Sequence, residues 1–279
     1  MGDRVVVYKT FDNYGSDEMQ LQYYISDVDK RIELYIMGIG FIVLVLLIAR
    51  KNGLKALFAL IVTIAFIIKI FIPAIYNGYS PIFFAIITTI FSSLVTIYFT
   101  VGMNKKFVVA LLGVTSGVLI AGILSYIFTY RMRLNGFLDS DLLASAYLLK
   151  NVKIKELIPA GVIIGSLGAV MDVAVSITSS INELHETDPN MSKKSMFKSA
   201  INIGNDIIGT MINTLILAYI ASSIFTLLLI YIQANEYPLI RILNFQDIAV
   251  EIMRSICGSI GILIAVPLTA YIGTLIYKK

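Results

Sequence analysis

A series of about seven apolar runs, each long enough for a transmembrane helix, constrains this 279-residue chain more than any other feature. A helix needs about 20 apolar residues to cross roughly 30 Å of hydrocarbon. We therefore predict an all-α fold, a polytopic membrane helix bundle with a transmembrane domain over residues 32–279. The expected spans cover residues 32–49, 54–73, 79–101, 107–129, 157–181, 209–232 and 255–277.

The composition supports a lipid bilayer as the surroundings of most of the chain. Apolar residues make up 58% of the sequence and charged residues 14%, whereas soluble domains average about 25% charged residues. This excludes a water-soluble globular enzyme, a disordered chain and a disulfide scaffold. The net charge of +4 is spread between the apolar runs. Because no basic patch with interleaved aromatic residues occurs, we expect no nucleic-acid partner.

Residues 1–31 are more polar than the rest and form a separate extracytoplasmic segment in this interpretation. Residues 5–8 and 21–25 are rich in Val, Ile and Tyr, and a polar turn at 12–15 separates them. This pattern predicts two short strands, a β-like extramembrane hairpin. An isolated hairpin is marginally stable, so we expect it to belong to, or to dock on, a larger extramembrane sheet.

Two further segments are predicted to be amphipathic helices in the membrane interface. In residues 131–155, apolar side chains recur at steps of three and four from Leu134 to Leu149, and charged residues lie off that face. Residues 193–208 are basic and precede the sixth span. Lys and Arg gather near residues 50–55, 105–106, 193–198 and 278–279. The positive-inside rule then places the N-terminus outside and the C-terminus in the cytoplasm.

Asp172 is the residue that most suggests chemistry, because it lies well inside the fifth span. A charged side chain in hydrocarbon costs roughly 2.5–3.5 kcal/mol on insertion scales. Steps of three and four from Asp172 reach Ser176, Ser179 and Glu183, which form one polar stripe. An intramembrane carboxylate of this kind is a candidate for binding and releasing a proton.

The next span carries a matching stripe that includes Asp206, Thr210, Asn213 and Thr214. Consecutive spans joined by a short loop run antiparallel. We therefore predict that Asp172 faces Asn213 and Thr214, that Ser176 faces Thr210, and that Ser179 faces Asp206. The alternative is that these hydroxyl and amide groups only hold helices together, which contributes around 0.6 kcal/mol each.

Small residues in two spans predict close helix contacts, because glycine lets helix backbones approach one another in membranes. The helix-contact candidates are Gly113, Gly117, Gly161, Gly165 and Gly168.

No enzymatic motif occurs in the sequence, and we expect neither a cofactor nor a metal site. A phosphate-binding Gly-x-x-x-x-Gly-Lys-Ser/Thr loop, a Gly-x-Ser-x-Gly elbow and a Cys/His cluster are all absent from the sequence. His185 is interpreted as a loop histidine and Cys257 as a small buried apolar residue. An intramembrane enzyme would need Asp206 within about 8 Å of Asp172 for shared acid–base work.

The blocks GSLGAVMDVAVSITSSINELHE (165–186) and NIGNDIIGTMINTLILA (202–218) resemble the YibE/F family of bacterial multi-pass membrane proteins. That resemblance covers roughly residues 32–279 and implies a bacterial plasma-membrane protein. Family members often occur as related pairs, which implies a hetero-oligomer with a paralogous membrane protein. Residues 161–232 are also weakly similar to the transmembrane core of the RND superfamily and its SecD and SecF branch. There, Asp172 would take the place of the membrane acid.

Together these features favour a permease or export accessory in which Asp172 couples proton movement to helix rearrangement. The alternative is a non-transporting membrane scaffold that pairs with a paralogue or with other membrane machinery.

Overall fold

The computed structural model describes residues 4–12, 20–136, 149–233 and 238–278. It divides into two compact units, residues 1–57 and 58–279, which are described separately below. The chain is overwhelmingly helical, and six of the described helices are long and apolar enough to cross a membrane. An all-α polytopic bundle with a short N-terminal sheet is therefore confirmed.

The N-terminal unit begins with a two-stranded antiparallel sheet, as the two segments rich in Val, Ile and Tyr predict. Strands β1 (Val5–Asp12) and β2 (Gln20–Val28) pair from Val5 opposite Val28 to Asp12 opposite Gln20. The register shifts once, between Val6 and Val7. Just beyond the sheet, the Arg31 guanidinium donates two 2.8 Å hydrogen bonds to the Asp29 carboxylate.

The first candidate span is too long for one membrane crossing. Helix α1 (Arg31–Phe66), a π-helical turn (Ile67–Phe71) and α2 (Ile72–Tyr76) form a continuous run of 46 residues. At 1.5 Å per residue a straight helix of this length would measure about 69 Å, more than twice the hydrocarbon thickness. Arg50 interrupts it with a non-helical backbone (φ 48°, ψ −126°). The parts of this run before and after Arg50 correspond to the predicted spans 32–49 and 54–73. The six candidate helices are therefore long enough for the seven predicted spans.

Gly53 makes this interruption of α1 sterically feasible. A Cβ atom at Gly53 would lie 2.7 Å from the Val45 carbonyl oxygen and 2.9 Å from the Ala49 Cβ. The backbone after Arg50 therefore packs directly on the helical turn before it, and only glycine fits there.

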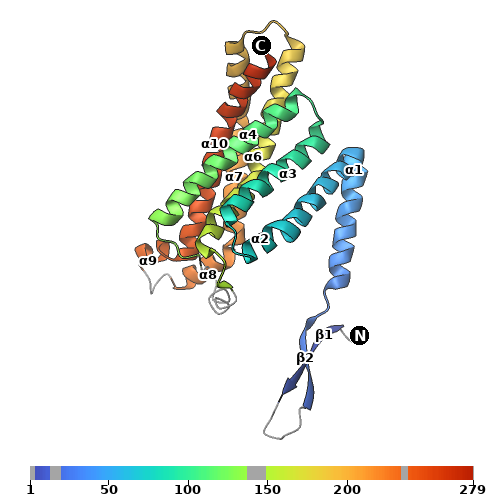
Figure 1. The fold of residues 1–279 in the computed structure, drawn as a ribbon, viewed down its shortest axis with the longest axis vertical. Coiled ribbons are helices and arrows are strands. Elements are labelled where there is room, and N and C mark those ends of the chain that lie inside the picture. The colour runs from blue at the N-terminus through green and yellow to red at the C-terminus, as the bar shows by residue number, and fades with distance from the viewer. Residues whose placement is uncertain (1–3, 13–19, 137–148, 234–237, 279) are drawn as a thin grey trace. The chain divides into compact units, whose positions relative to one another are not determined.

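The second unit contains the remaining helices, shown in Figure 1. Ser80 and Asn104 cap the first two, because their side-chain oxygens accept hydrogen bonds from Phe83 N and Phe107 N, and Ser192 caps α7 in the same way. The elements are α3 (Pro81–Val101), α4 (Lys105–Arg131), α6 (Ile154–Thr187), α7 (Lys193–Ser222), α8 (Ile224–Gln233), α9 (Leu239–Leu243) and α10 (Gln246–Tyr277).

Two predicted boundaries differ from the structure. Residues 193–208 do not form a separate interfacial helix, because α7 continues without interruption to Ser222 and the break comes there instead of at 208. Buried Met196, Ala200 and Gly204 keep one packed face through this region, and no proline interrupts it. Within the predicted interfacial helix 131–155, residues 137–148 lie outside the described residues. Its described ends belong to α4, to turns and to α6.

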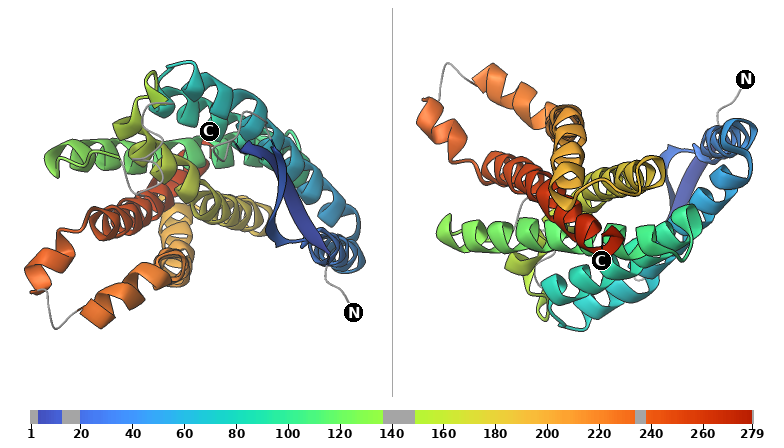
Figure 2. Two further views of the ribbon diagram at one scale, coloured as in Figure 1. Left: turned by 90° about the horizontal axis from the view of Figure 1, so that it is seen from below. Right: turned by 90° about the horizontal axis from the view of Figure 1, so that it is seen from above.

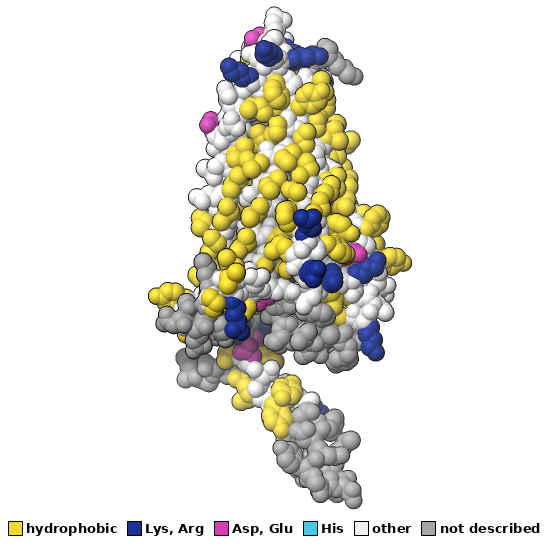
Figure 3. Space-filling model, turned by 90° about the vertical axis from the view of Figure 1, so that its left-hand side faces the viewer, with side chains coloured by type: hydrophobic (Ala, Val, Ile, Leu, Met, Phe, Trp, Pro, Cys, Tyr) yellow, Lys and Arg dark blue, Asp and Glu magenta, His cyan; other side chains and the backbone are white. Residues whose placement is uncertain are grey.

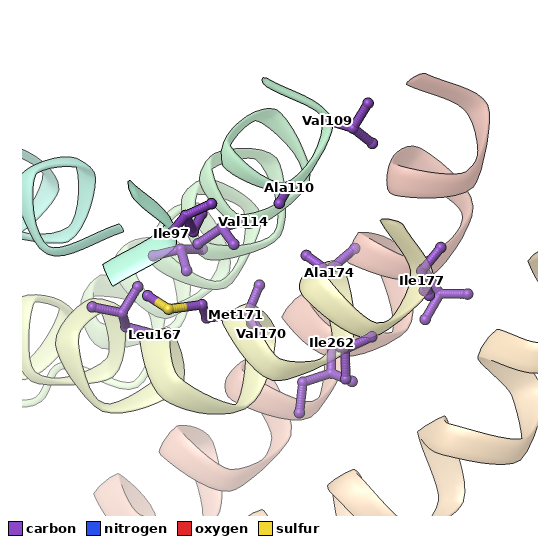
Figure 4. Close-up of a cluster of buried hydrophobic side chains, with 14 of the residues drawn as sticks. Ile97, Val109, Ala110, Val114, Leu167, Val170, Met171, Ala174, Ile177 and Ile262 are labelled. Atoms are coloured by element: carbon purple, nitrogen blue, oxygen red, sulfur yellow. The ribbon is translucent and has the colours of Figure 1, made fainter. Parts of the chain in front are cut away.

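The core of the second unit lies between α4, α6 and α10, and α10 runs between α4 and α7 (Figure 2). The closest approach joins α4 to α10. A Cβ at Gly117 would lie 2.9 Å from the Gly261 carbonyl oxygen, and one at Gly113 would collide with Thr269 Oγ1. Figure 4 shows the apolar side chains that fill the adjoining space, among them Val114 of α4, Val170 of α6 and Ile262 of α10.

The outer surface of the molecule is strongly apolar. Figure 3 shows a broad band of hydrophobic side chains on one face, with Lys and Arg side chains above and below it. Bands of this kind match the hydrocarbon and headgroup layers of a bilayer.

Candidate functional site

The predicted stripe on α6 exists, but it lies on the outside of the chain. Asp172, Ser176, Ser179 and Glu183 are all exposed. The opposite face of α6, which includes Val170 and Ala174, is fully buried. Asp172 is therefore not buried within this chain as the sequence predicted. The reason is that the small and apolar residues of α6 face α4 and α10, and this turns the polar residues outward.

The stripe on α7 is exposed in the same way. Asp206, Thr210, Asn213 and Thr214 are exposed, as is Asn202 one turn before Asp206. The packed face of α7 is formed instead by Met196, Ala200, Gly204 and Leu215. At 100° per residue, Asp206 and Asn213 lie on the side of the helix opposite Gly204.

The predicted side-chain pairs between the two stripes are not formed. Within the part of the chain that the structure describes, no hydrogen bond or ion pair joins Asp172, Ser176 or Ser179 to α7. The Thr210 and Thr214 hydroxyls instead donate 2.9 Å hydrogen bonds to backbone carbonyls of α7, those of Ile207 and Thr210. The sequence identified the two stripes correctly but not the rotation of each helix about its axis.

We call these residues the α6–α7 polar face. It consists of Asp172, Ser176, Ser179 and Glu183 on α6 and of Asn202, Asp206, Thr210, Asn213 and Thr214 on α7. Its helix α7 has the lowest mean hydropathy of the six candidate spans, and only 11% of its most apolar window is buried. Charged groups facing lipid are costly, so this face needs polar surroundings that the described part of the chain does not supply.

A second polar cluster lies at the start of α10, and sequence reasoning missed it. Arg254 Nη1 donates a 2.8 Å hydrogen bond to Glu251 Oε1, and both side chains are less than one quarter exposed. The Arg254 guanidinium carbon lies 5.9 Å from the centre of the Tyr219 ring on α7. We call Tyr219, Glu251 and Arg254 the α10 ion-pair cluster.

The surroundings of this cluster are almost entirely apolar. A cavity of about 460 Å³ between α7, α8, α9 and α10 is lined by Glu251, Tyr219 and Asp247 together with many Ile and Leu side chains. The sequence signal was present, because Glu251 and Arg254 stand three residues apart, as ion pairs on helices do. It was missed because the seventh span was expected to begin at residue 255.

The glycines proposed for helix contacts differ in what surrounds them. Gly113 and Gly117 lie against α10, as described above. Gly165 lies beside Tyr219, since a Cβ there would be 3.0 Å from its hydroxyl oxygen, whereas the nearest atom to a Cβ at Gly161 is Arg254 Nη2, at 3.8 Å. A Cβ at Gly168 would meet no atom within 4 Å. Three of the five therefore lie on the α6 face that carries Asp172, not in the packed core.

No group of three or more His, Cys, Asp or Glu side chains suited to a metal ion occurs among the described residues. Cys257 is buried. His185 is partly buried, and its ring lies edge-on to Tyr277 at 5.4 Å between centroids.

Comparison with curated proteins and with solved structures gives no match. The similarity to the RND core therefore has no support from these comparisons. The model of the family described as YibE/F-like protein matches residues 37–279, which is most of the chain and includes both polar clusters. With six helices able to cross a membrane, this multi-pass integral membrane protein belongs to the YibE/F-like protein family.

Proposed function

We propose that this protein is a subunit of a proton-coupled permease or export complex, and that Asp172 on the α6–α7 polar face carries the proton. The observation that carries the proposal is the position of this face, which places three acids and a series of hydroxyl and amide groups on helices of membrane-spanning length. Intramembrane acids commonly mark proton and ion pathways. The expected site is the bacterial plasma membrane, with the N-terminus outside and the C-terminus in the cytoplasm.

The outward position of the polar face supports a path that is completed by a second protein. Ser176 and Ser179 follow Asp172 by one and two helical turns, so their hydroxyl groups can relay protons or hold water along α6. Facing lipid, the same groups would be poorly satisfied. A paralogous membrane protein seated on α6 and α7 would close the path on its open side.

Proton flux in inverted membrane vesicles tests the role of Asp172. Vesicles from cells that produce the full chain with its membrane partners are given a pH gradient, and its decay is followed with a pH-sensitive dye. We expect Asp172→Asn to reduce the protein-dependent flux about a hundredfold, the lower range for a positioned proton-transfer group. The matched control is Asp188→Asn, which removes an exposed acid in the loop after α6. Equal flux in wild type and Asp172→Asn would overturn the proposal.

A static scaffold is the second candidate function, and the same outward polar face favours it, because a docking surface needs no path. Cross-linking from Ser176→Cys, on the polar face, is compared with cross-linking from Leu94→Cys, at an exposed apolar position of α3, to distinguish partner contact from lipid contact. A scaffold predicts capture of one membrane protein from position 176 with no effect of Asp172→Asn on flux. A permease subunit predicts both the capture and the loss of flux.

A further inference from the structure

The polar stripe of α6 extends beyond Asp172 to the other end of the helix. Going back along the chain, steps of four and three lead from Asp172 to Gly168, Gly165 and Gly161. All three glycines therefore share the face of α6 that carries Asp172, Ser176 and Ser179. The absence of side chains at these positions leaves a shallow track along the helix.

Polar atoms from two other helices occupy the far end of this track. The Tyr219 hydroxyl of α7 lies at Gly165, and the guanidinium of Arg254 on α10 lies at Gly161. Asp172 is seven residues from Gly165, which is about 10 Å along the helix axis. The α10 ion-pair cluster thus continues the line of polar groups that begins at Glu183.

The atoms of this cluster retain unused hydrogen-bonding capacity. Among the described residues, seven buried side-chain polar atoms have no hydrogen-bond partner, and three of them are Tyr219 OH, Glu251 Oε2 and Arg254 Nε. Buried polar groups are normally paired, so such a concentration at one place calls for a functional explanation. Glu251 Oε2 is an acceptor that can take a proton while Glu251 Oε1 keeps its bond to Arg254.

We propose that Glu251 is a second proton-binding site on the path, with Arg254 as its charge partner and Tyr219 between it and Asp172. This inference rests on the proposed function of the α6–α7 polar face. A proton added to Glu251 Oε2 neutralises the carboxylate and weakens its attraction to the guanidinium of Arg254, which stays charged. Loss of that proton restores the ion pair.

The other charged groups around Glu251 are compatible with this role. Asp247 and Arg254 on its own helix and Tyr219 on α7 interact with it electrostatically. From α6, the cluster is met by Gly161 and Gly165, which have no titratable side chain. The 460 Å³ cavity that Glu251 and Asp247 line leaves open space next to the Glu251 carboxyl group at this end of the path.

Labelling with N,N′-dicyclohexylcarbodiimide tests whether Glu251 takes up a proton within the membrane. This lipid-soluble reagent modifies protonated carboxyl groups, and mass spectrometry of the full chain in vesicles locates the adduct. We expect labelling of Glu251 to increase as the pH is lowered, and to be severalfold greater in Arg254→Gln, since an adjacent cation favours the ionised form. Asp188, an exposed loop acid, serves as the internal control and should stay unlabelled. An unlabelled Glu251 in both proteins overturns the inference.

Proton flux separates a failure of this inference from a failure of the proposed function. We expect Glu251→Gln to lower the flux about a hundredfold, as expected for Asp172→Asn. Loss of flux in Asp172→Asn with normal flux in Glu251→Gln overturns the second site alone. Normal flux in both variants overturns the proposed function and the second site with it.

A double variant controls for misfolding, because Glu251→Gln leaves a half-buried arginine without its partner. Glu251→Gln/Arg254→Gln replaces the ion pair by two neutral amides of similar shape. We expect it to reach wild-type amounts in the membrane and still to lack flux. Recovery of flux in the folded double variant would show that Glu251 carries no proton.

Discussion

The Tyr277 hydroxyl on α10 donates a 3.0 Å hydrogen bond to Asn182 Oδ1 on α6. Asn182 Nδ2 in turn donates a 2.7 Å bond to Glu186 Oε1 one turn further along α6. Lys105, in the first turn of α4, lies 5.7 Å from the centre of the Tyr277 ring. Three helices that are far apart in sequence are thus joined at one end of the bundle.

Tyr277→Phe should destabilise this end of the bundle without changing its packing. The variant removes one hydrogen bond and leaves Asn182 Oδ1 without its donor, which costs about 1–3 kcal/mol for a buried group. Thermal unfolding of the purified protein in detergent measures the loss. Tyr271→Phe is the control, because Tyr271 is 57% exposed and should be neutral. Equal effects of the two variants would contradict the role of the Asn182 bond.

Gly117→Ala should destabilise the protein through overpacking. The added Cβ would lie 2.8 Å from Ala265 Cβ and from Val170 Cγ1, so α4 must move away from α10 or α6. Overpacking of this kind costs about 1–3 kcal/mol.

Gly209→Ala is a matched control with the opposite expected sign. A Cβ at Gly209 of α7 meets no atom within 4 Å. In a helix interior, alanine is favoured over glycine by about 0.5–1 kcal/mol. A rise in unfolding temperature for Gly209→Ala and a fall for Gly117→Ala are expected, and the same sign for both would count against the tight α4–α10 crossing.

The positions of the helices were largely predictable, because the length and the hydropathy of a membrane-spanning helix are both properties of one continuous stretch of sequence. The N-terminal hairpin was predictable in the same local way, from two segments rich in Val, Ile and Tyr and the polar turn between them. The positions at which one helix ends and the next begins were less predictable. The sequence contains no proline near position 208, and the end of α7 at Ser222 is set within a long apolar run.

The direction in which the candidate site faces could not be predicted from the sequence of one helix. The spacing from Asp172 to Glu183 predicts a shared helix face, but the direction of that face depends on which side of α6 packs against α4 and α10. The packed side of α6 depends in turn on residues of other helices. Gly117 and Gly261, for example, have no side chains, so Val170 can approach Gly117 closely and Ala121 can approach Gly261. The link between Tyr219 and Gly165 is equally invisible in sequence, because it joins residues 54 positions apart (219 − 165).

Arg50 occupies a backbone conformation that suits glycine, and Arg50→Gly should therefore stabilise the bend in α1. At φ 48° and ψ −126° a residue with a Cβ is strained, and such conformations cost about 1–3 kcal/mol. The control Lys51→Gly removes the same charge from the adjacent helical position and should cost about 0.5–1 kcal/mol. Unfolding temperatures of the two variants should shift in opposite directions. Destabilisation by Arg50→Gly would show that the arginine side chain, and not the backbone, sets the bend.

Asp29 should stay ionised at unusually low pH. The Arg31 side chain donates two hydrogen bonds to this carboxylate, and the Arg31 backbone N–H donates a third, which together lower the Asp29 pKa from 3.8 to about 2. Since the folded-state pKa lies below the unfolded one, the stabilisation is fully present above 3.8 and disappears as the pH falls towards 2. The hydrogen bond from Lys30 lowers the pKa of Asp27 as well.

Carbon-13 NMR of aspartate carboxyl groups in the detergent-solubilised protein measures these titrations. Arg31→Gln should return the titration midpoint of the Asp29 carboxyl group to near 3.8 and leave the titration of Asp27 unchanged. Lys30→Gln is the converse control, since Lys30 pairs with Asp27 whereas Arg31 pairs with Asp29. A wild-type Asp29 midpoint near 3.8 would mean that the ion pair with Arg31, which connects the N-terminal sheet to the start of α1, does not form in solution.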